Sequence, residues 1–312
     1  MLLKRLSLFA TYTLLTVYSL IVFACGVKDD FTVKDSPTTG KITVYFDEGL
    51  TLHVNNQINT FKTTYKYADI SLKSSNENDC ISALFNDSSK AIIINRKLTA
   101  SELQKFEAKN IHTETSVVAK NAIAFIVGND FPDSTISITE LKELLRGNNT
   151  NGFETTIIFD NQNSGSAHFL KDSLLPNVSF GASCSATNNT KELIDKISKT
   201  KNAIGVCDYA WLSDKDDTTT KEFLKTVKIL AVSKNENETA YMPDQSNIAT
   251  GDYPLCKTLC VIRRSAEFSL AKGVQTFIAG EKGQLMFLKQ GLPPNRQEER
   301  VIEINMEPMK MN

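Results

Sequence analysis

The sequence predicts an α/β protein made of two units, each a parallel sheet with helices on both faces. Between residues 41 and 109, short segments rich in β-branched and aromatic residues alternate with segments of helical pattern. This alternation is typical of parallel sheets whose crossover connections are helices. A second series begins at residue 121 and forms a unit of about 130 residues, the size of an ordinary domain. The 312 residues of the chain suffice for both units.

The first unit consists of strands and helices in alternation. Its third strand, 91–94, is nearly all apolar, as expected of a strand that is buried on both faces. Thr99 and Glu102 have the spacing of a capping box, in which two side chains bond the backbone at the start of a helix. The predicted strands are 41–46, 68–72 and 91–94, and the predicted helices are 52–65, 79–86 and 101–109.

The second unit continues the alternation, and a C-terminal region follows it. Gly147 is expected to end the first helix of this unit. The predicted strands are 121–127, 155–159, 202–207 and 227–232, and the predicted helices are 139–146, one that begins after Ser164, and 191–200. The C-terminal region is predicted to contain an extended run at 253–262, helices at 266–279 and 281–290, a strand at 301–304 and a tail at 306–312.

The N-terminus has the pattern of a bacterial lipoprotein signal peptide. Lys4 and Arg5 precede an apolar segment, which ends in alanine and is followed directly by Cys25. We expect residues 1–24 to be removed, Cys25 to carry the lipid, and residues 25–40 to form a polar tether. The alternative is an N-terminal membrane anchor, because the apolar segment is just long enough to span a bilayer.

The residues after Cys25 bear on the location of the protein. Gly26-Val-Lys-Asp-Asp30 resembles the export signal on surface-exposed lipoproteins of the Bacteroidetes group. The expected location is therefore the cell envelope, either the periplasm or the outer-membrane surface. The choice between the inner and the outer membrane stays open.

The composition argues against several kinds of partner. The chain has 35 Lys and Arg against 36 Asp and Glu, so no basic surface for a nucleic acid is predicted. It contains no CxxC motif, and its three histidines (His53, His112 and His168) are not paired in sequence. We therefore expect neither a bound metal nor a cofactor.

Five cysteines follow Cys25, and this odd number leaves at least one thiol free. Cys256 and Cys260 lie on a predicted strand, where residues four apart are separated by about 13 Å and cannot form a disulfide. Cys184 with Cys207 is the one pairing considered, and its state stays open. The other interpretation for all five residues is burial as small hydrophobic side chains.

The stretch 155–170 has the elements of an anion site. Ser164 suits the N-cap of a helix, and a helix that starts at the end of a strand offers free N–H groups and a positive partial charge. Asp160, in the turn before this helix, would repel an anion. The alternative interpretation is that Ser164 is only a cap and Asp160 only a turn residue.

Several motifs together resemble one protein family. Asn202-Ala-Ile-Gly-Val with Tyr209, Tyr253-Pro-Leu, the segment 280–291 and Ser164-Gly165-Ser166 follow each other in the order and spacing of that family. On these motifs, residues 40–305 resemble the substrate-binding lipoprotein of phosphate ABC transporters, in the form found in Bacteroidetes.

The resemblance implies a two-lobed, periplasmic-binding-protein-like fold of type 2, with two doubly wound lobes joined by two crossing strands near residues 118–124 and 250–258. Lobe 1 would contain residues 40–120 plus 256–305, and lobe 2 residues 121–255. A small solute, phosphate or another ligand, would bind in the cleft between the lobes, without catalysis. An ABC permease is the implied protein partner, the lipid anchor would provide the contact with the membrane, and a monomer is expected.

The resemblance also places the site residues, and it reveals a conflict of charge. The family's arginine stands four residues before the first serine of the phosphate loop, and in this chain that position is Asp160. Each contact near 4 Å between like charges costs about 4 kcal/mol at an effective dielectric constant of 20. Either some of the carboxylates are protonated or point away from the cleft, or the ligand is not phosphate, and an amine, a zwitterion or a hydrated cation would suit the charges better. The implied ligand-binding residues are Asp47, Glu48, Gly49, Asn95, Arg96, Asp160, Asn161, Ser164, Gly165 and Ser166.

Other hypotheses stay open at this point. Arg96 could pair with Glu102 or Glu107 instead of contacting a ligand. Asp160, Ser164 and His168 could form a serine hydrolase site, although no GxSxG motif is present. A third hypothesis is a surface lipoprotein that uses the same fold as an interaction module and does not take part in transport.

Overall fold

The computed structural model describes residues 35–148, 155–265 and 268–296. In this part of the chain, nine strands form one mixed sheet, in which eight strands follow the order β2-β1-β3-β11-β4-β8-β6-β7 and β9 pairs with β4. The predicted signal peptide, Cys25, most of the tether, the strand 301–304 and the tail lie outside the described residues. No helix within the described residues is long and apolar enough to cross a membrane.

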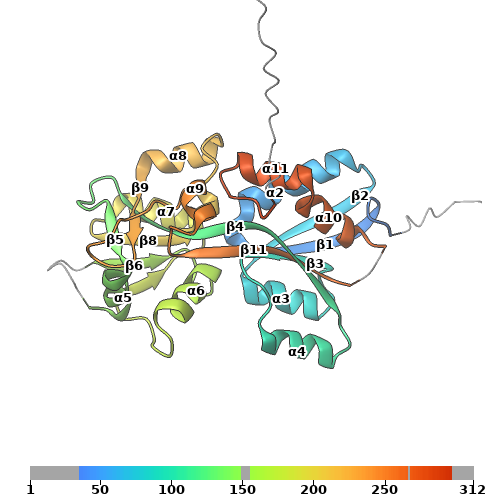
Figure 1. Cartoon of the computed structure of the whole chain (residues 1–312), viewed down its shortest axis with the longest axis horizontal. Helices are drawn as coiled ribbons and strands as arrows, with labels where there is room; N and C mark the ends of the chain where they lie inside the picture. Colours follow the sequence, from blue (N-terminus) through green and yellow to red (C-terminus); the bar gives the residue numbers. More distant parts are fainter. Residues whose placement is uncertain (1–34, 149–154, 266–267, 297–312) are drawn as a thin grey trace, which may run out of the picture. The chain divides into compact units, whose positions relative to one another are not determined.

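Lobe 1 contains the first half of the sheet (Figure 1). Strand β1 lies between β2 and β3, and all three are parallel, which confirms the alternation predicted from the sequence. The helices α10 and α11 near the C-terminus pack against α2. The elements are β1 (Gly40–Asp47), η1 (Glu48–Leu50), α2 (Thr51–Thr64), β2 (Ala68–Ser75), α3 (Glu77–Phe85), β3 (Ala91–Ile94), α4 (Ala100–Ala108), α10 (Leu270–Ala279) and α11 (Glu281–Lys289).

Lobe 2 contains the second half of the sheet, where β6 lies between β7 and β8 and is parallel to both. The predicted strand 227–232 is instead two strands, because the chain leaves the large sheet after β9 and pairs with β5 through β10. The elements are β5 (Thr135–Ser137), α5 (Ile138–Arg146), β6 (Thr156–Phe159), α6 (Gly165–Leu174), β7 (Cys184–Ala186), α7 (Thr190–Lys199), β8 (Ala203–Asp208), η2 (Tyr209–Trp211), α8 (Thr218–Thr226), β9 (Val227–Ile229), β10 (Ala231–Ser233) and α9 (Gln245–Thr250).

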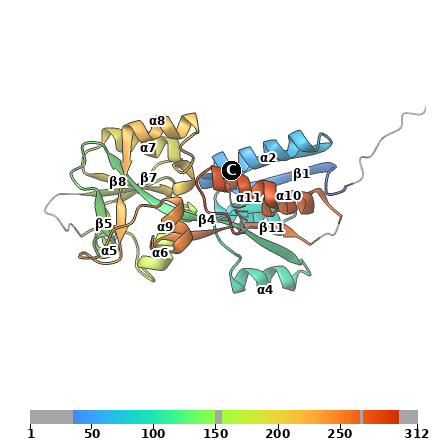
Figure 2. The same cartoon turned by 45° about the horizontal axis from the view of Figure 1, so that its top comes forward.

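Two strands connect the lobes (Figures 1 and 2). Strand β4 (Thr113–Gly128) pairs with β11 (Cys256–Arg264) through Ala122, and from Ile123 it pairs with β8. Strand β11 in turn pairs with β3 of lobe 1. The carboxyl ends of β1 and β3 in lobe 1, and of β6 and β8 in lobe 2, are followed by the loops that matter for the candidate site.

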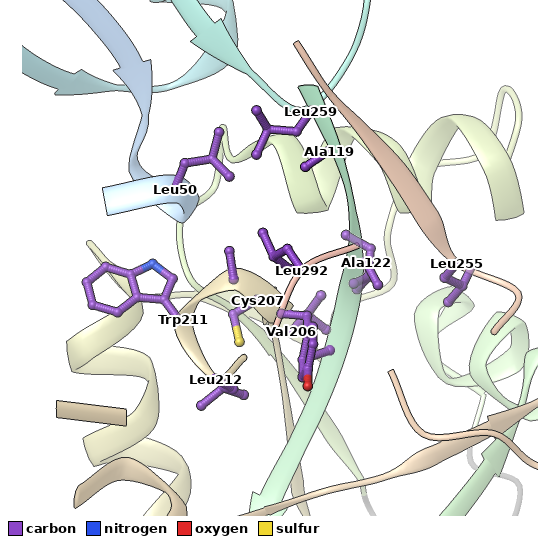
Figure 3. Close-up of a cluster of buried hydrophobic side chains, with 14 of the residues drawn as sticks. Leu50, Ala119, Ala122, Val206, Cys207, Trp211, Leu212, Leu255, Leu259 and Leu292 are labelled. Atoms are coloured by element: carbon purple, nitrogen blue, oxygen red, sulfur yellow. The ribbon is translucent and has the colours of Figure 1, made fainter. Parts of the chain in front are cut away.

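The hydrophobic core is continuous between the lobes. One cluster of buried side chains includes Leu50 of η1 together with Trp211 and Leu212 at the end of β8. Figure 3 shows Trp211 and Leu50 on the same side of this cluster, with Leu292 nearby. Segment η1 packs directly against η2, so apolar contacts as well as the two connecting strands join the lobes.

All five cysteines of the described residues are free, so the considered Cys184–Cys207 disulfide is wrong. Cys184 lies on β7 and Cys207 on β8, and these strands flank β6 on opposite sides. Strands two positions apart are separated by about 10 Å, which is beyond the reach of a disulfide. Burial raises the pKa of the Cys207 thiol well above its usual value, as expected of a small hydrophobic side chain.

The predicted capping box of α4 is confirmed. The Thr99 hydroxyl accepts a hydrogen bond from the Glu102 backbone N–H at 3.2 Å, and the Glu102 carboxylate accepts one from the Thr99 N–H at 2.8 Å. We expect Thr99→Ala to lower the free energy of unfolding by about 1 kcal/mol. Urea unfolding measures this change, with Ser101→Ala, at an exposed position on the same helix, as the control that should have no such cost.

Candidate functional site

Four strands of the two lobes end at one buried polar cluster. Asp47 ends β1, Asn95 follows β3, Asp160 follows β6 and Asp208 ends β8. All four side chains are almost completely buried. The carboxyl ends of parallel strands are where α/β folds bind their ligands, so this cluster is the candidate functional site.

Two asparagines hold the cluster together. Asn95 Nδ2 donates hydrogen bonds to Asp47 Oδ2 at 3.1 Å and to Asp208 Oδ2 at 3.3 Å. Asn121 Nδ2, from β4, donates to Asn95 Oδ1 at 3.1 Å and to Asp208 Oδ1 at 3.0 Å. The Ala210 N–H donates to Asn121 Oδ1 at 3.1 Å, which fixes the orientation of this amide. The network therefore crosses from lobe 1 to lobe 2.

Lys257 of β11 is the buried cation of the cluster. Its Nζ lies 3.0 Å from Asp208 Oδ1, and both side chains are almost fully buried. Burial alone lowers the pKa of Lys257, but the carboxylates of Asp208, Glu77 and Asp47 outweigh it and raise the pKa above its usual value. The ammonium group is therefore charged at neutral pH.

Glu77, at the start of α3, brings a further carboxylate into the cluster and is 2% exposed. Its Oε1 accepts a hydrogen bond from the Asn95 N–H at 3.1 Å, and its Oε2 accepts one from Arg96 Nε at 3.2 Å. The two terminal nitrogens of Arg96 bond both oxygens of Glu102, at 2.8 and 2.9 Å. The hypothesis that Arg96 pairs with Glu102 is thus confirmed, with Glu77 as a second partner that was not predicted.

Two glycines allow carboxylates to approach a helix start in the other lobe. A Cβ atom added at Gly165, the first residue of α6, would lie 2.8 Å from Glu77 Oε1 and 3.0 Å from Asp47 Oδ2. A Cβ atom added at Gly49 would lie 2.0 Å from Asp208 Oδ2. Any larger residue at these positions would push the carboxylates away. Carboxyl groups of each lobe therefore pack directly against the backbone of the other.

The surroundings of the carboxyl groups favour their neutral forms. Burial, together with the carboxylates of Asp208 and Glu48, raises the pKa of Asp160 to about 7, although the Ser164 hydroxyl acts in the opposite direction. Burial and the neighbouring Asp208 and Glu77 raise the pKa of Asp47 well above its usual value. Burial also raises the pKa values of Asp208 and Glu48, against the effects of Lys257 and of the Thr190 hydroxyl respectively.

The other predicted site residues have different roles. Asn161 turns away from the cluster, since its side chain donates to Asn188 O at 3.2 Å and accepts from the Asn163 N–H at 2.8 Å. Glu48 Oε2 accepts a hydrogen bond from the Thr190 hydroxyl at 2.9 Å. The Ser164 hydroxyl caps α6 by accepting from the Ala167 N–H at 3.2 Å, as expected.

The hydrolase arrangement considered for Asp160, Ser164 and His168 is not formed among the described residues. The backbone N–H of His168 donates to the Ser164 carbonyl at 3.1 Å, but no hydrogen bond joins the His168 ring to the Ser164 hydroxyl in this part of the chain. The same described residues contain no group of three or more His, Cys, Asp and Glu side chains that could hold a metal ion.

Comparison with known proteins identifies the family. Residues 33–282 match the family described as the PBP superfamily domain. The chain belongs to the PBP superfamily. A search of curated protein sequences gave no match.

Solved structures confirm the two-lobed fold of the PBP superfamily. One similar structure is a putative phosphate ABC transporter substrate-binding protein with bound phosphate from Clostridium perfringens, with 15% identity and a TM-score of 0.68 over 82% of this chain and 100% of that one. A second is an ABC-type phosphate transport receptor from Vibrio cholerae, with 15% identity and a TM-score of 0.63 over 81% of this chain and 99% of that one. A third is the CcmR regulatory domain from Synechocystis PCC6803 in complex with 2-PG, with 14% identity and a TM-score of 0.53 over 82% of this chain and 100% of that one.

The PBP superfamily fold therefore does not by itself decide the ligand. Of these three structures, one is a substrate-binding protein of a transporter, one is a transport receptor and one is a regulatory domain. Within this chain, the fold brings together Asp47, Glu48, Gly49, Asn95, Asp160 and Gly165, all of which the sequence indicated. It adds Glu77, Asn121, Asp208 and Lys257, which the sequence analysis missed.

Proposed function

We propose that this member of the PBP superfamily is an extracytoplasmic solute-binding protein that takes a small solute between its lobes. The observation that carries this proposal is the convergence of polar side chains from the ends of β1, β3, β6 and β8 on one cluster between the lobes. Ligand sites in open α/β sheets lie at this position, outside the carboxyl ends of the strands.

The energetics of the cluster support a functional role. Carboxyl groups that are buried beside one another cost free energy, and apolar side chains of similar volume would usually stabilise a fold more. Asp47, Asp160 and Asp208 are each about 2% exposed or less. Perturbed ionisable groups of this kind concentrate at functional sites.

The membrane and transport aspects of the proposal rest on the sequence. A lipid at Cys25 would hold the protein at the cell envelope, and an ABC permease would receive the solute. The proposed role involves binding and release without a chemical step, so it requires no cofactor. The ligand is a small molecule, and phosphate is one candidate among several.

A solute panel tests the proposed function. At a concentration about 100 times its dissociation constant, a ligand stabilises the folded state by about 2.7 kcal/mol, which raises the melting temperature measurably. Thermal shift of the lipid-free mature chain should identify at least one such solute among amino acids, amines, divalent cations, phosphate and sulfate.

Two variants serve as comparisons in this panel. Asn121→Ala removes an amide that bonds Asn95 and Asp208, so it should abolish the shift. Asn56→Ala changes an exposed asparagine on α2 and should preserve it. If no solute in the panel raises the melting temperature of the native chain, or if the shift survives in Asn121→Ala, the proposed binding site is wrong.

A second candidate is an interaction module that keeps its lobes together without a solute. The continuous apolar core between Leu50 of lobe 1 and Trp211 of lobe 2 favours it, because burial of large side chains between lobes opposes their separation. Such a module would give no response to the panel. A solute-dependent shift that Asn121→Ala abolishes would therefore decide for the binding protein.

A further inference from the structure

The N-terminus of α6 has the properties of an oxyanion site. This helix has ten residues, and the backbone N–H groups in its first turn have no acceptors within the helix. Ser166 Oγ, in the same turn, is fully buried and has no hydrogen-bond partner of ordinary geometry among the described residues. Its hydroxyl nevertheless lies near enough to Asp208 to lower the pKa of that carboxyl group.

The space in front of this helix start is filled by the protein itself. The carboxyl groups of Asp47 and Glu77, both from lobe 1, lie against Gly165, and a Cβ atom there would approach them to 3.0 and 2.8 Å. Both side chains are 2% exposed. Two carboxyl groups of lobe 1 thus pack against the helix start at which lobe 2 would contact an oxyanion.

Lobe 1 supplies hydrogen-bond donors to the same two groups. The Asn95 N–H and Arg96 Nε donate to the two oxygens of Glu77, at 3.1 and 3.2 Å, and Asn95 Nδ2 donates to Asp47 Oδ2 at 3.1 Å. Backbone N–H, amide and guanidinium groups are the donors that hold oxyanions in proteins. The two carboxyl groups therefore accept hydrogen bonds from lobe 1, as an anionic ligand would, and pack against the helix start of lobe 2.

The cations that the described residues bring to the cluster are already paired with carboxylates. Lys257 is paired with Asp208, and Arg96 is paired with Glu77 and Glu102. The carboxyl groups of Asp160 and Glu48 add negative charge to this region, and Lys191 offsets part of the charge of Glu48. An added dianion would meet several like charges in a site from which water is excluded.

From these contacts we infer that Asp47 and Glu77 form an internal pseudo-ligand, which fills the oxyanion position of the cleft and prevents the native chain from binding inorganic phosphate. The two residues determine specificity, because they exclude an oxyanion and hold the lobes together in its absence. This inference rests on the proposed function, since it assigns the ligand class that the cleft rejects. Removal of both carboxyl groups frees the Asn95 and Arg96 donors, and the same position then accepts an oxyanion.

Calorimetry with inorganic phosphate and with sulfate at pH 7 tests the inference on the lipid-free mature chain. The native chain should bind neither ion, and the double variant Asp47→Ala/Glu77→Ala should bind at least one of them, at least about 100-fold more tightly than the native limit of detection. Asp160→Ala is the matched control, because it removes a buried carboxyl group of the same cluster other than the two that lie nearest to a Cβ atom at Gly165. This control should remain without binding.

The possible outcomes separate the inference from the proposed function. Micromolar binding of phosphate by the native chain would overturn the pseudo-ligand and support the proposed binding role. A folded double variant that binds neither ion, or an Asp160→Ala variant that binds as well as the double variant, would also overturn the pseudo-ligand. In the last two cases the result of the solute panel still tests the proposed function independently.

A measurement on the native chain keeps the inference testable if the double variant does not fold. Small-angle scattering should give the same radius of gyration with and without phosphate, because the internal carboxyl groups already close the cleft. A solute-free chain that is more extended and contracts on addition of phosphate would contradict the pseudo-ligand.

Discussion

Replacement of Lys257 by methionine is expected to lower the free energy of unfolding by about 3–5 kcal/mol at pH 7. Lys257 Nζ lies 3.0 Å from Asp208 Oδ1, and both side chains are almost completely buried. Methionine preserves much of the volume of the side chain but leaves Asp208 without its cation, beside the carboxyl groups of Asp47 and Glu77. The loss of a partner from a buried ion pair costs more than the net contribution of the pair, since the remaining charge is not compensated. Urea unfolding followed by circular dichroism measures the change.

Two further variants test whether this loss comes from the ion pair. The double variant Lys257→Met/Asp208→Asn should recover most of the stability, because it leaves no buried charge unpaired at this position. Lys120→Met, on the neighbouring strand β4, changes an exposed lysine and should alter the stability by less than about 0.5 kcal/mol. A Lys257→Met chain as stable as the native one would mean that Asp208 is neutral in the folded protein and needs no cation.

The parts of the fold that local chemistry determines could be predicted from the sequence. The alternation of strands and helices in lobe 1, the capping box of α4 and the N-cap at Ser164 depend on residues that are neighbours in the chain. The prediction of a single strand at 227–232 was wrong for a reason that is not local. Its residues suit strands throughout, and only tertiary pairing divides them between β4 and β5.

The candidate site was predictable in outline, because the positions at the ends of strands are visible in the sequence. Its chemistry was less so, since the partners lie far apart in the chain. Glu77 meets Gly165, and Lys257 meets Asp208, only after the lobes come together. One signal was available: Asn121 begins the run 121–127, whose other residues are apolar, and Lys257 lies in the largely apolar run 253–262, and a buried polar residue requires a partner.

The pKa of Asp160 leads to a second large effect, which depends on pH. Burial raises this pKa from the usual 3.8 to about 7 in the folded chain. Below the unfolded value the carboxyl group is protonated in both states and contributes no pH dependence. Between the two values only the folded chain holds the proton, so its stability falls by about 1.4 kcal/mol per pH unit. Above about 7 both states are ionised, and the accumulated loss levels off at about 4 kcal/mol.

Asp160→Asn is therefore expected to stabilise the chain strongly at pH 8 and little at pH 4.5. Asparagine retains the oxygen that accepts the Asn161 N–H at 3.0 Å, so the turn before α6 is preserved. The difference in the free energy of unfolding between variant and native chain should grow from less than about 1 kcal/mol at pH 4.5 to about 2–4 kcal/mol at pH 8. Asp130→Asn, in an exposed loop after β4, is the control and should give the same difference at both pH values.

A constant difference for Asp160→Asn between pH 4.5 and 8 would show that the Asp160 carboxyl group titrates alike in the folded and unfolded states.

The expected increase with pH has a further consequence for the cleft. The lobes bury Asp160 near Asp208 and Glu48, and burial raises the pKa values of all three groups. A chain with its lobes apart would solvate these groups and release protons. Rising pH should therefore favour separation of the lobes, and Asp160→Asn should weaken that dependence.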